Sequence, residues 1–231
     1  MRGLLYNQLF TFRLPLGAIF GSQIFAMFVA IAGGNDFSTQ FGMGICMIAP
    51  YIIFLLTNSE LFHYDEGEKW CCFAVSTPQS FKGQVAAKYL FSLGINVLTL
   101  LTSLICCGIL SAVSGENLIS NMRMGLLFFG ITVTFNAFEF PFYFRFGSEH
   151  GSQIKAVSIG IVLLAVCIYG LFGDISFLFS DTIVEDLLNL FNGTAFRTMS
   201  TFLPAISVAL LFLSFLISVP LYRKGIECYE K

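Results

Sequence analysis

Six long apolar runs constrain this chain more than any other feature of its sequence. Each approaches the roughly 20 residues that an α-helix needs to cross the hydrocarbon layer of a membrane. The runs lie at about residues 16–32, 41–56, 89–113, 124–144, 156–172 and 202–222. They are apolar on all sides and carry Gly and Pro, whereas strands of a membrane barrel alternate in polarity over short segments. We therefore predict an all-α integral membrane protein with six transmembrane helices in one domain, 1–231.

The charge content agrees with a membrane protein and excludes nucleic acid as a partner. Charged residues make up 11% of the chain, against the roughly 25% typical of soluble proteins. The net charge is −2, and the basic residues are scattered rather than gathered into a stripe. Membrane lipid is the expected surrounding.

The positions of the cations predict the orientation. With the N-terminus inside, all of the 12 Lys and Arg residues except Arg123 and Arg197 fall on the inner side. Because inner loops of membrane proteins are enriched in Lys and Arg, both termini are predicted to be cytoplasmic. The loops at about residues 57–88 and 145–155 are predicted to be cytoplasmic as well.

A polar stretch in the first inner loop leads directly into the third apolar run. Thr77 suits a helix N-cap and Pro78 suits the first helical position. In the helix that follows, Phe81 and Val85 share one face with Gln84 and Lys88 on its flank, and Gln79, Lys82 and Ala86 point away. Two interpretations remain open: a docking element for a partner protein, or an interfacial helix that returns the chain to the bilayer.

Glu139 is the one carboxylate that we place inside a predicted span. An ionisable group in the membrane costs a few kcal/mol at the bilayer centre, so it needs a partner. Pro141 is predicted to break the helix locally beside it. Arg145 or a lysine of an inner loop is the expected partner, and a structural ion pair is favoured over a proton relay.

Two further amphipathic helices are predicted outside the spans. One precedes the first span, around Tyr6 and Phe10, and suits the inner leaflet. The other lies in the outer loop 173–200, where residues 182–185 form a capping box and Asn192-Gly193 supplies a stop. This outer helix either caps the bundle or borders an exit path.

Recognisable catalytic and metal-binding patterns are missing. There is no GxxxxGK[ST] phosphate loop, no GxSxG and no HExxH. The seven cysteines form no CxxC pair and are predicted to be small apolar fillers, and the acidic cluster around residues 65–68 is predicted to be a hydrated face. We expect no catalytic, cofactor-binding or metal-binding residues, which leaves a permease or another membrane scaffold.

Two segments resemble the permease subunits of ABC-type exporters, in the small six-span class that includes phenol-soluble-modulin and other peptide exporters. The first segment runs from Tyr64-Asp65-Glu66-Gly67-Glu68-Lys69-Trp70 through Ser76-Thr77-Pro78 and Lys82-Gly83 to Ala87-Lys88-Tyr89-Leu90. The second is Pro141-Phe142-Tyr143-Phe144-Arg145-Phe146-Gly147-Ser148-Glu149-His150-Gly151. The six-span layout extends the resemblance over most of the chain.

The resemblance implies a bacterial cell-membrane exporter in which two permease chains, identical or paralogous, pair above two separate ABC ATPase subunits. The ATPase subunits would bind ATP and Mg²⁺, and the substrate would be an amphipathic peptide or a similar hydrophobic compound. The inner loop between spans two and three would carry a coupling helix. The implied ATPase-docking residues are Thr77, Pro78, Gln79, Ser80, Phe81, Lys82 and Gln84.

Two other function classes stay open from the sequence. An ion-coupled secondary transporter needs ion-binding groups at mid-membrane, commonly beside broken helices in repeated halves. No convincing internal repeat is seen in this chain. A non-transporting scaffold or immunity protein needs neither a docking helix nor a mobile pore.

Overall fold

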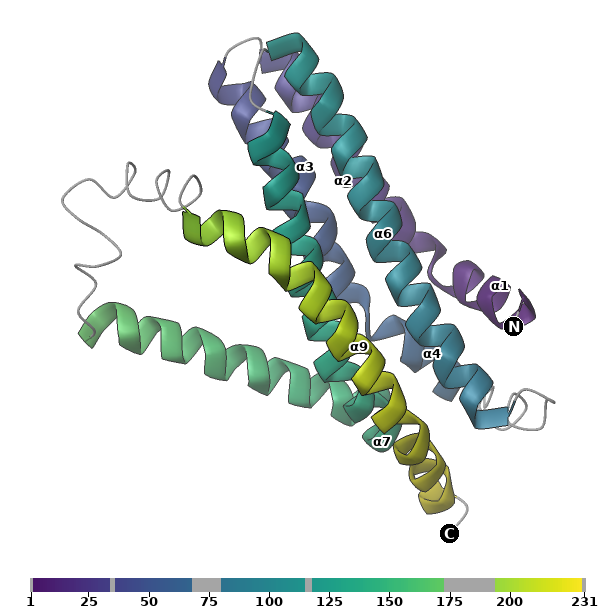
Figure 1. The fold of residues 1–231 in the computed structure, drawn as a ribbon. Coiled ribbons are helices and arrows are strands. Elements are labelled where there is room, and N and C mark those ends of the chain that lie inside the picture. The colour runs from purple at the N-terminus through teal and green to yellow at the C-terminus, as the bar shows by residue number, and fades with distance from the viewer. Residues whose placement is uncertain (1, 34–35, 68–79, 115–117, 173–193, 230–231) are drawn as a thin grey trace.

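The computed structural model describes residues 2–33, 36–67, 80–114, 118–172 and 194–229, and every element within these ranges is an α-helix (Figure 1). The helices are α1 (Arg2–Thr11), α2 (Arg13–Gly33), α3 (Asp36–Thr57), α4 (Glu60–Gly67), α6 (Ser80–Ser114), α7 (Leu118–Phe172) and α9 (Thr194–Tyr229). The all-α fold predicted from the apolar runs is confirmed.

Five stretches of the described residues are long and apolar enough to cross a membrane. They are Arg13–Gly33, Ser38–His63, Lys82–Ala112, Asn121–Ser158 and Ser200–Arg223. Each covers all or nearly all of one of the predicted spans. The remaining predicted span, 156–172, falls in the last part of α7, which is helical to Phe172. A separate sixth crossing stays a prediction.

Helices α2 and α3 form a close antiparallel pair (Figure 1). The contact depends on small residues. A Cβ atom on Gly42 would lie 2.5 Å from the Cβ of Ala30 and 2.8 Å from the carbonyl oxygen of Ala26. Such small residues let helix backbones approach closely where no hydrophobic driving force acts between them.

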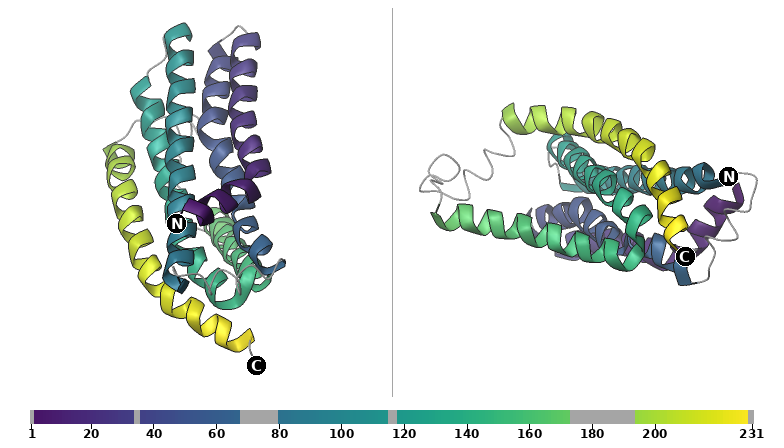
Figure 2. Two further views of the ribbon diagram at one scale, coloured as in Figure 1. Left: turned by 90° about the vertical axis from the view of Figure 1, so that its right-hand side faces the viewer. Right: turned by 90° about the horizontal axis from the view of Figure 1, so that it is seen from below.

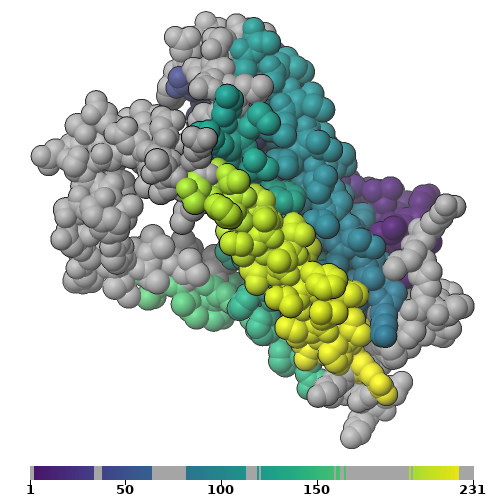
Figure 3. All heavy atoms as spheres, in the orientation of Figure 1, coloured from purple at the N-terminus to yellow at the C-terminus, as the bar shows by residue number. Residues whose placement is uncertain are grey.

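Helix α6 is the element that connects the parts of the bundle. It contacts α1, α2, α3, α7 and α9. The first half of α7 packs along α9. In Figures 1 and 2 this pair lies next to the α2–α3 pair. In the space-filling view α9 lies diagonally across the front face, with α6 next to it (Figure 3).

Helix α7 turns sharply at Gly147, and its second half diverges from the bundle (Figure 1). Gly147 has φ 82° and ψ 177°, a backbone region that is essentially restricted to glycine. The predicted break at Pro141 is wrong, because Pro141 lies within the helix and the turn comes six residues later. The predicted inner loop 145–155 is therefore a corner between two helical arms.

An aromatic core lies near this corner. Its fully buried side chains include Phe12, Phe54 and Phe140. A second cluster, farther along the α2–α3 pair, contains the fully buried Cys46 and Cys107, which confirms apolar packing for these two cysteines. Side chains of the cysteines at 71, 72, 167 and 228 lie outside the described part.

Of the two predicted amphipathic helices, one is described. Helix α1 is present over residues 2–11, with Tyr6 and Phe10 exposed. Its position along the inner leaflet stays a prediction. The predicted outer helix, with its capping box at 182–185, lies outside the described residues.

Candidate functional site

The helix that carries the last of the predicted docking residues, from Ser80 onward, continues without a break into the membrane span. Helix α6 begins at Ser80 and ends at Ser114. Within it, Lys82 is exposed, whereas Gln84 is only 4% exposed and accepts a hydrogen bond of 2.7 Å from the Tyr222 hydroxyl of α9. Gln84 therefore makes an internal contact within the bundle, and its role in docking stays a prediction. Outside the described side chains lie Thr77, Pro78, Gln79, Ser80 and Phe81.

A stripe of buried polar residues runs along the inner face of α6. Its members are Gln84, Lys88, Ser92, Asn96, Thr99 and Ser103, each at most 4% exposed. The spacing of three or four residues places them on one side of the helix. Sequence reasoning put Gln84 and Lys88 on the flank of a surface helix and missed the other four. Polar residues at helical spacing inside an apolar run were the signal that would have found them.

Lys88 attaches this stripe to helix α4. Its ammonium group donates a hydrogen bond to the carbonyl oxygen of Leu61 and lies 4.2 Å from the ring centroid of Phe62. Both contacts suit a cation whose side chain is 4% exposed, since the carbonyl and the aromatic face replace lost water. Lys88 thus links α6 to the first turn of α4.

Asparagines extend the stripe across the bundle. Asn58, between α3 and α4, donates a hydrogen bond of 3.0 Å to the side-chain oxygen of Asn136 on α7. Asn136 in turn donates to the hydroxyl of Ser92 on α6, also at 3.0 Å. All three side chains are buried, so the break between α3 and α4 is bound to α7 and α6 by a continuous chain of hydrogen bonds.

The same face of α6 holds α2 and α9 by further hydrogen bonds. Gln23 of α2 donates to the hydroxyl of Ser103 at 2.8 Å. At the other end, the Tyr89 hydroxyl lies 2.6 Å from that of Ser214 and 2.7 Å from that of Ser218. With the contacts above, α6 makes polar side-chain contacts to α2, α4, α7 and α9.

Glu139 pairs with Lys155 across the Gly147 corner. The Lys155 ammonium lies 3.3 Å from the Glu139 carboxylate. The contact is an ion pair without a well-directed hydrogen bond. The Lys155 side chain is 10% exposed and the Glu139 side chain 5%. Lys155 also donates a hydrogen bond to the carbonyl oxygen of Leu55, in the last turn of α3. A cation suits this helix terminus because the last carbonyl groups carry partial negative charge.

Glu139 is thus paired with a lysine of the inner region, one of the two partners that we expected, and the structural role of the pair, as opposed to a proton relay, stays a prediction. The alternative, Arg145, is not the partner. Arg145 is half-buried and faces the groove between α7 and α9 instead. The ion pair joins the two arms of α7, and Lys155 and Lys88 together hold carbonyl groups on either side of the α3–α4 break.

Aromatic packing completes the corner. The ring of Phe62 on α4 stacks on Tyr143 with a centroid separation of 4.7 Å and meets Phe140 and Phe144 edge-on at 5.3 and 5.1 Å. Such ring pairs add about 0.5–1.5 kcal/mol each beyond their buried area. The α4 helix, the start of α6 and the Gly147 corner therefore form one packed unit, which we call the corner unit.

No metal centre is found in the described part of the chain. Within it, no group of three or more His, Cys, Asp or Glu side chains lies close enough together to hold an ion. The side chains of the acidic cluster around residues 65–68 lie outside the described part, so its interpretation stays a prediction.

Comparison with known proteins gives the family. The family model of the ABC-2 family transporter proteins matches residues 3–223. No curated protein and no solved structure matches the chain. The narrower class of phenol-soluble-modulin and other peptide exporters stays a prediction. Because the match extends over nearly the whole helical bundle, the chain belongs to the ABC-2 transporter family and is a multi-pass membrane permease of an ABC transporter, which works with an ABC ATPase.

Proposed function

We propose that the chain is the transmembrane subunit of an exporter for amphipathic peptides or similar hydrophobic compounds. Two permease chains, identical or paralogous, form the membrane unit, and two ATPase subunits bind ATP and Mg²⁺ beneath it. Both termini and the corner unit face the cytoplasm. The distribution of cations supports this orientation, since Lys82, Lys88, Arg145 and Lys155 all lie near the corner unit.

Helix α6 is the observation that carries the proposal. At 1.5 Å per residue, its 35 residues extend about 52 Å in one unbroken rod. Displacement of α6 at Lys82 would be transmitted to the corner unit through Lys88. It would be transmitted to α9 through Gln84 and Tyr89. A motor protein that docks at the start of α6 is therefore mechanically connected to most of the bundle.

The environment of Glu139 supports an ATP-driven cycle over ion coupling. Proton-coupled transporters commonly use a carboxylate inside the membrane that takes up and releases its proton. Glu139 instead contacts a lysine that also holds a helix terminus. Because the carboxylate already has a partner within the protein, we assign the energy for transport to ATP hydrolysis by a separate subunit.

Docking is tested with Phe81→Ala and Lys82→Glu. Aromatic anchors usually carry most of the energy of an interface, and a rim charge sets the orientation and rate of binding. Both variants are expected to reduce co-purification of the ATPase while the permease still inserts in the membrane. Arg123→Glu is the matched charge reversal near the start of α7, at the opposite end of the bundle, and is expected to leave co-purification unchanged.

The outcome that contradicts the proposal is equally specific. If both docking variants bind the ATPase as the parent does, α6 begins as an interfacial connector and the motor docks elsewhere. Equal losses in all three variants would indicate general misfolding, which the inserted fraction reveals directly.

A further inference from the structure

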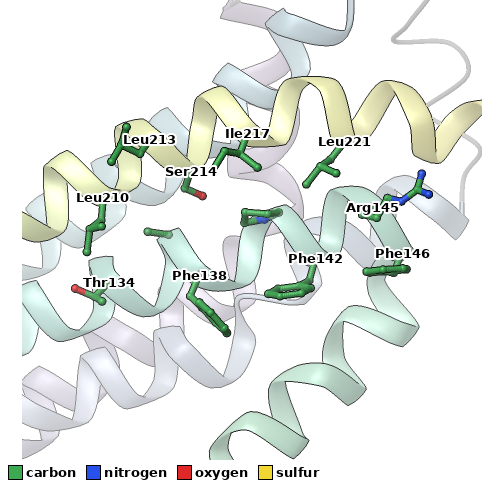
Figure 4. A pocket seen from close by; sticks show the side chains of 12 residues that line it. Thr134, Phe138, Phe142, Arg145, Phe146, Leu210, Leu213, Ser214, Ile217 and Leu221 are labelled. Carbon is green, nitrogen blue, oxygen red and sulfur yellow. The ribbon is translucent and has the colours of Figure 1, made fainter.

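An open groove lies between the first half of α7 and α9 (Figure 4). Its volume is about 680 Å³. The lining is apolar along most of its length, with Phe138 and Phe142 on one side and Leu213 and Ile217 on the other. Phe138, Leu213 and Ile217 are each more than half exposed, so the groove opens to the surroundings of the bundle.

The polar groups in the groove are bonded within the protein, with one exception. The Thr134 hydroxyl donates a hydrogen bond of 2.8 Å to the carbonyl oxygen of Gly130, and the Ser214 hydroxyl bonds to Tyr89. Arg145 lies at one end, and no ion pair or hydrogen bond joins it to another residue of the described chain. The groove therefore offers an apolar surface that ends in one available guanidinium group.

The length of the groove matches one leaflet of a bilayer. From Thr134 to Arg145 the helix rises about 16 Å at 1.5 Å per residue. Half of the hydrocarbon core of a bilayer is about 15 Å. With Arg145 at the depth of the headgroups, Thr134 lies near the bilayer centre.

We propose that this groove binds one anionic phospholipid, with an acyl chain along α7 and α9 and the phosphate on Arg145. The apolar lining matches the acyl chain, the position of the cation matches the headgroup, and guanidinium groups bind phosphate in a bidentate manner. A peptide laid in the groove in extended form would have unpaired main-chain groups opposite a wall whose hydroxyl groups are already hydrogen-bonded within the protein.

A second groove provides an internal comparison. It lies between α6 and α9, has a volume of about 290 Å³ and is lined by Leu90, Leu93, Val208 and Phe212 among others. None of its lining residues is charged. A lipid chain that lies there has no headgroup partner, so no preference for an anionic lipid is expected.

The proposal is tested by quenching of tryptophan fluorescence by brominated lipids. The chain contains one tryptophan, and Trp70→Phe removes it. Ile217→Trp then places a reporter in the α7–α9 groove, and Val208→Trp places one in the comparison groove. The full chain is reconstituted in phosphatidylcholine vesicles that contain brominated phosphatidylglycerol or brominated phosphatidylcholine at the same mole fraction.

At position 217 we expect the anionic lipid to bind about fivefold more tightly than the zwitterionic lipid. This ratio corresponds to a binding free energy of ~1 kcal/mol, which is typical of the attraction between one Lys or Arg and anionic headgroups. Arg145→Gln should bring this ratio to about one, and Arg145→Lys should retain most of it. The reporter at Val208 should give a ratio of about one throughout. Leu221→Trp, near Arg145 in the same groove, is a second reporter if Ile217→Trp folds poorly.

Two results would overturn the proposal. A ratio near one at the α7–α9 reporter with Arg145 intact means that the groove holds only ordinary boundary lipid. Loss of quenching by both lipids, together with cross-linking between two copies through Phe138→Cys, means that another chain covers the groove.

Discussion

Breaking the ion pair between Glu139 and Lys155 should destabilise the bundle more than removal of any nearby unpaired cation. Two unit charges 3.3 Å apart attract by about 5 kcal/mol at an effective dielectric constant of about 20. The desolvation of both groups opposes most of this attraction, but removal of one partner leaves the other charge buried and unpaired, at a cost of about 3–5 kcal/mol. Lys155→Met also removes the donor to Leu55 and should cost about 4 kcal/mol.

Glu139→Gln should cost less, about 2 kcal/mol, because Lys155 keeps its bond to Leu55 and is slightly more exposed. The double variant should lose about 2 kcal/mol less than the sum of the single losses, since neither charge is then left alone. Reversible unfolding by sodium dodecyl sulfate in mixed micelles, followed by circular dichroism, measures these free energies. Arg145→Gln is the control and should change stability by less than about 0.5 kcal/mol. Additive losses for Glu139 and Lys155, or coupling of Glu139 to Arg145, would refute the assignment.

Three further predictions concern the corner, the α2–α3 contact and the topology. Gly147→Ala should cost about 1–3 kcal/mol in the same unfolding assay, whereas Gly160→Ala, at an open helical position, should be neutral or stabilising; equal effects would argue against the corner. Gly42→Leu should destabilise by about 1–3 kcal/mol or more through overpacking, and an unchanged stability would contradict the close contact. In a background without native cysteines, Lys69→Cys and Gln153→Cys should resist an impermeant reagent added outside; labelling of either would contradict the orientation.

The sequence predicted the helices well because span length and all-round apolarity are imposed by the bilayer itself. It predicted the position of the turn in α7 poorly. Pro141 is the stronger local breaker, but membrane helices tolerate proline, and the turn falls at Gly147, where φ 82° and ψ 177° strongly favour glycine. The prediction rested on the proline alone and did not consider the glycine six residues later as a turning point.

The candidate site was predicted only in part for a related reason. Gln84 and Lys88 were assigned to a surface helix, although α6 already contacts α4, α7 and α9 at that level. A polar residue that points into a bundle cannot be told from one that points into water by spacing alone. The partner of Glu139 was likewise ambiguous, because Lys155 reaches it only after the chain has turned at Gly147.

In the proposed transport cycle, motion of an ATPase reaches the bundle through α6 and its buried link to α4. The most direct measurement is the number of ATP molecules hydrolysed per labelled amphipathic peptide exported, in vesicles that contain the permease and its ATPase. Lys88→Met should leave ATPase binding and hydrolysis in place but reduce export per ATP severalfold, and Lys88→Arg should restore much of it, because only the cation at Leu61 and Phe62 is changed. Export per ATP equal to that of the parent in Lys88→Met, or export that requires a proton gradient and no ATPase, would contradict this route of motion.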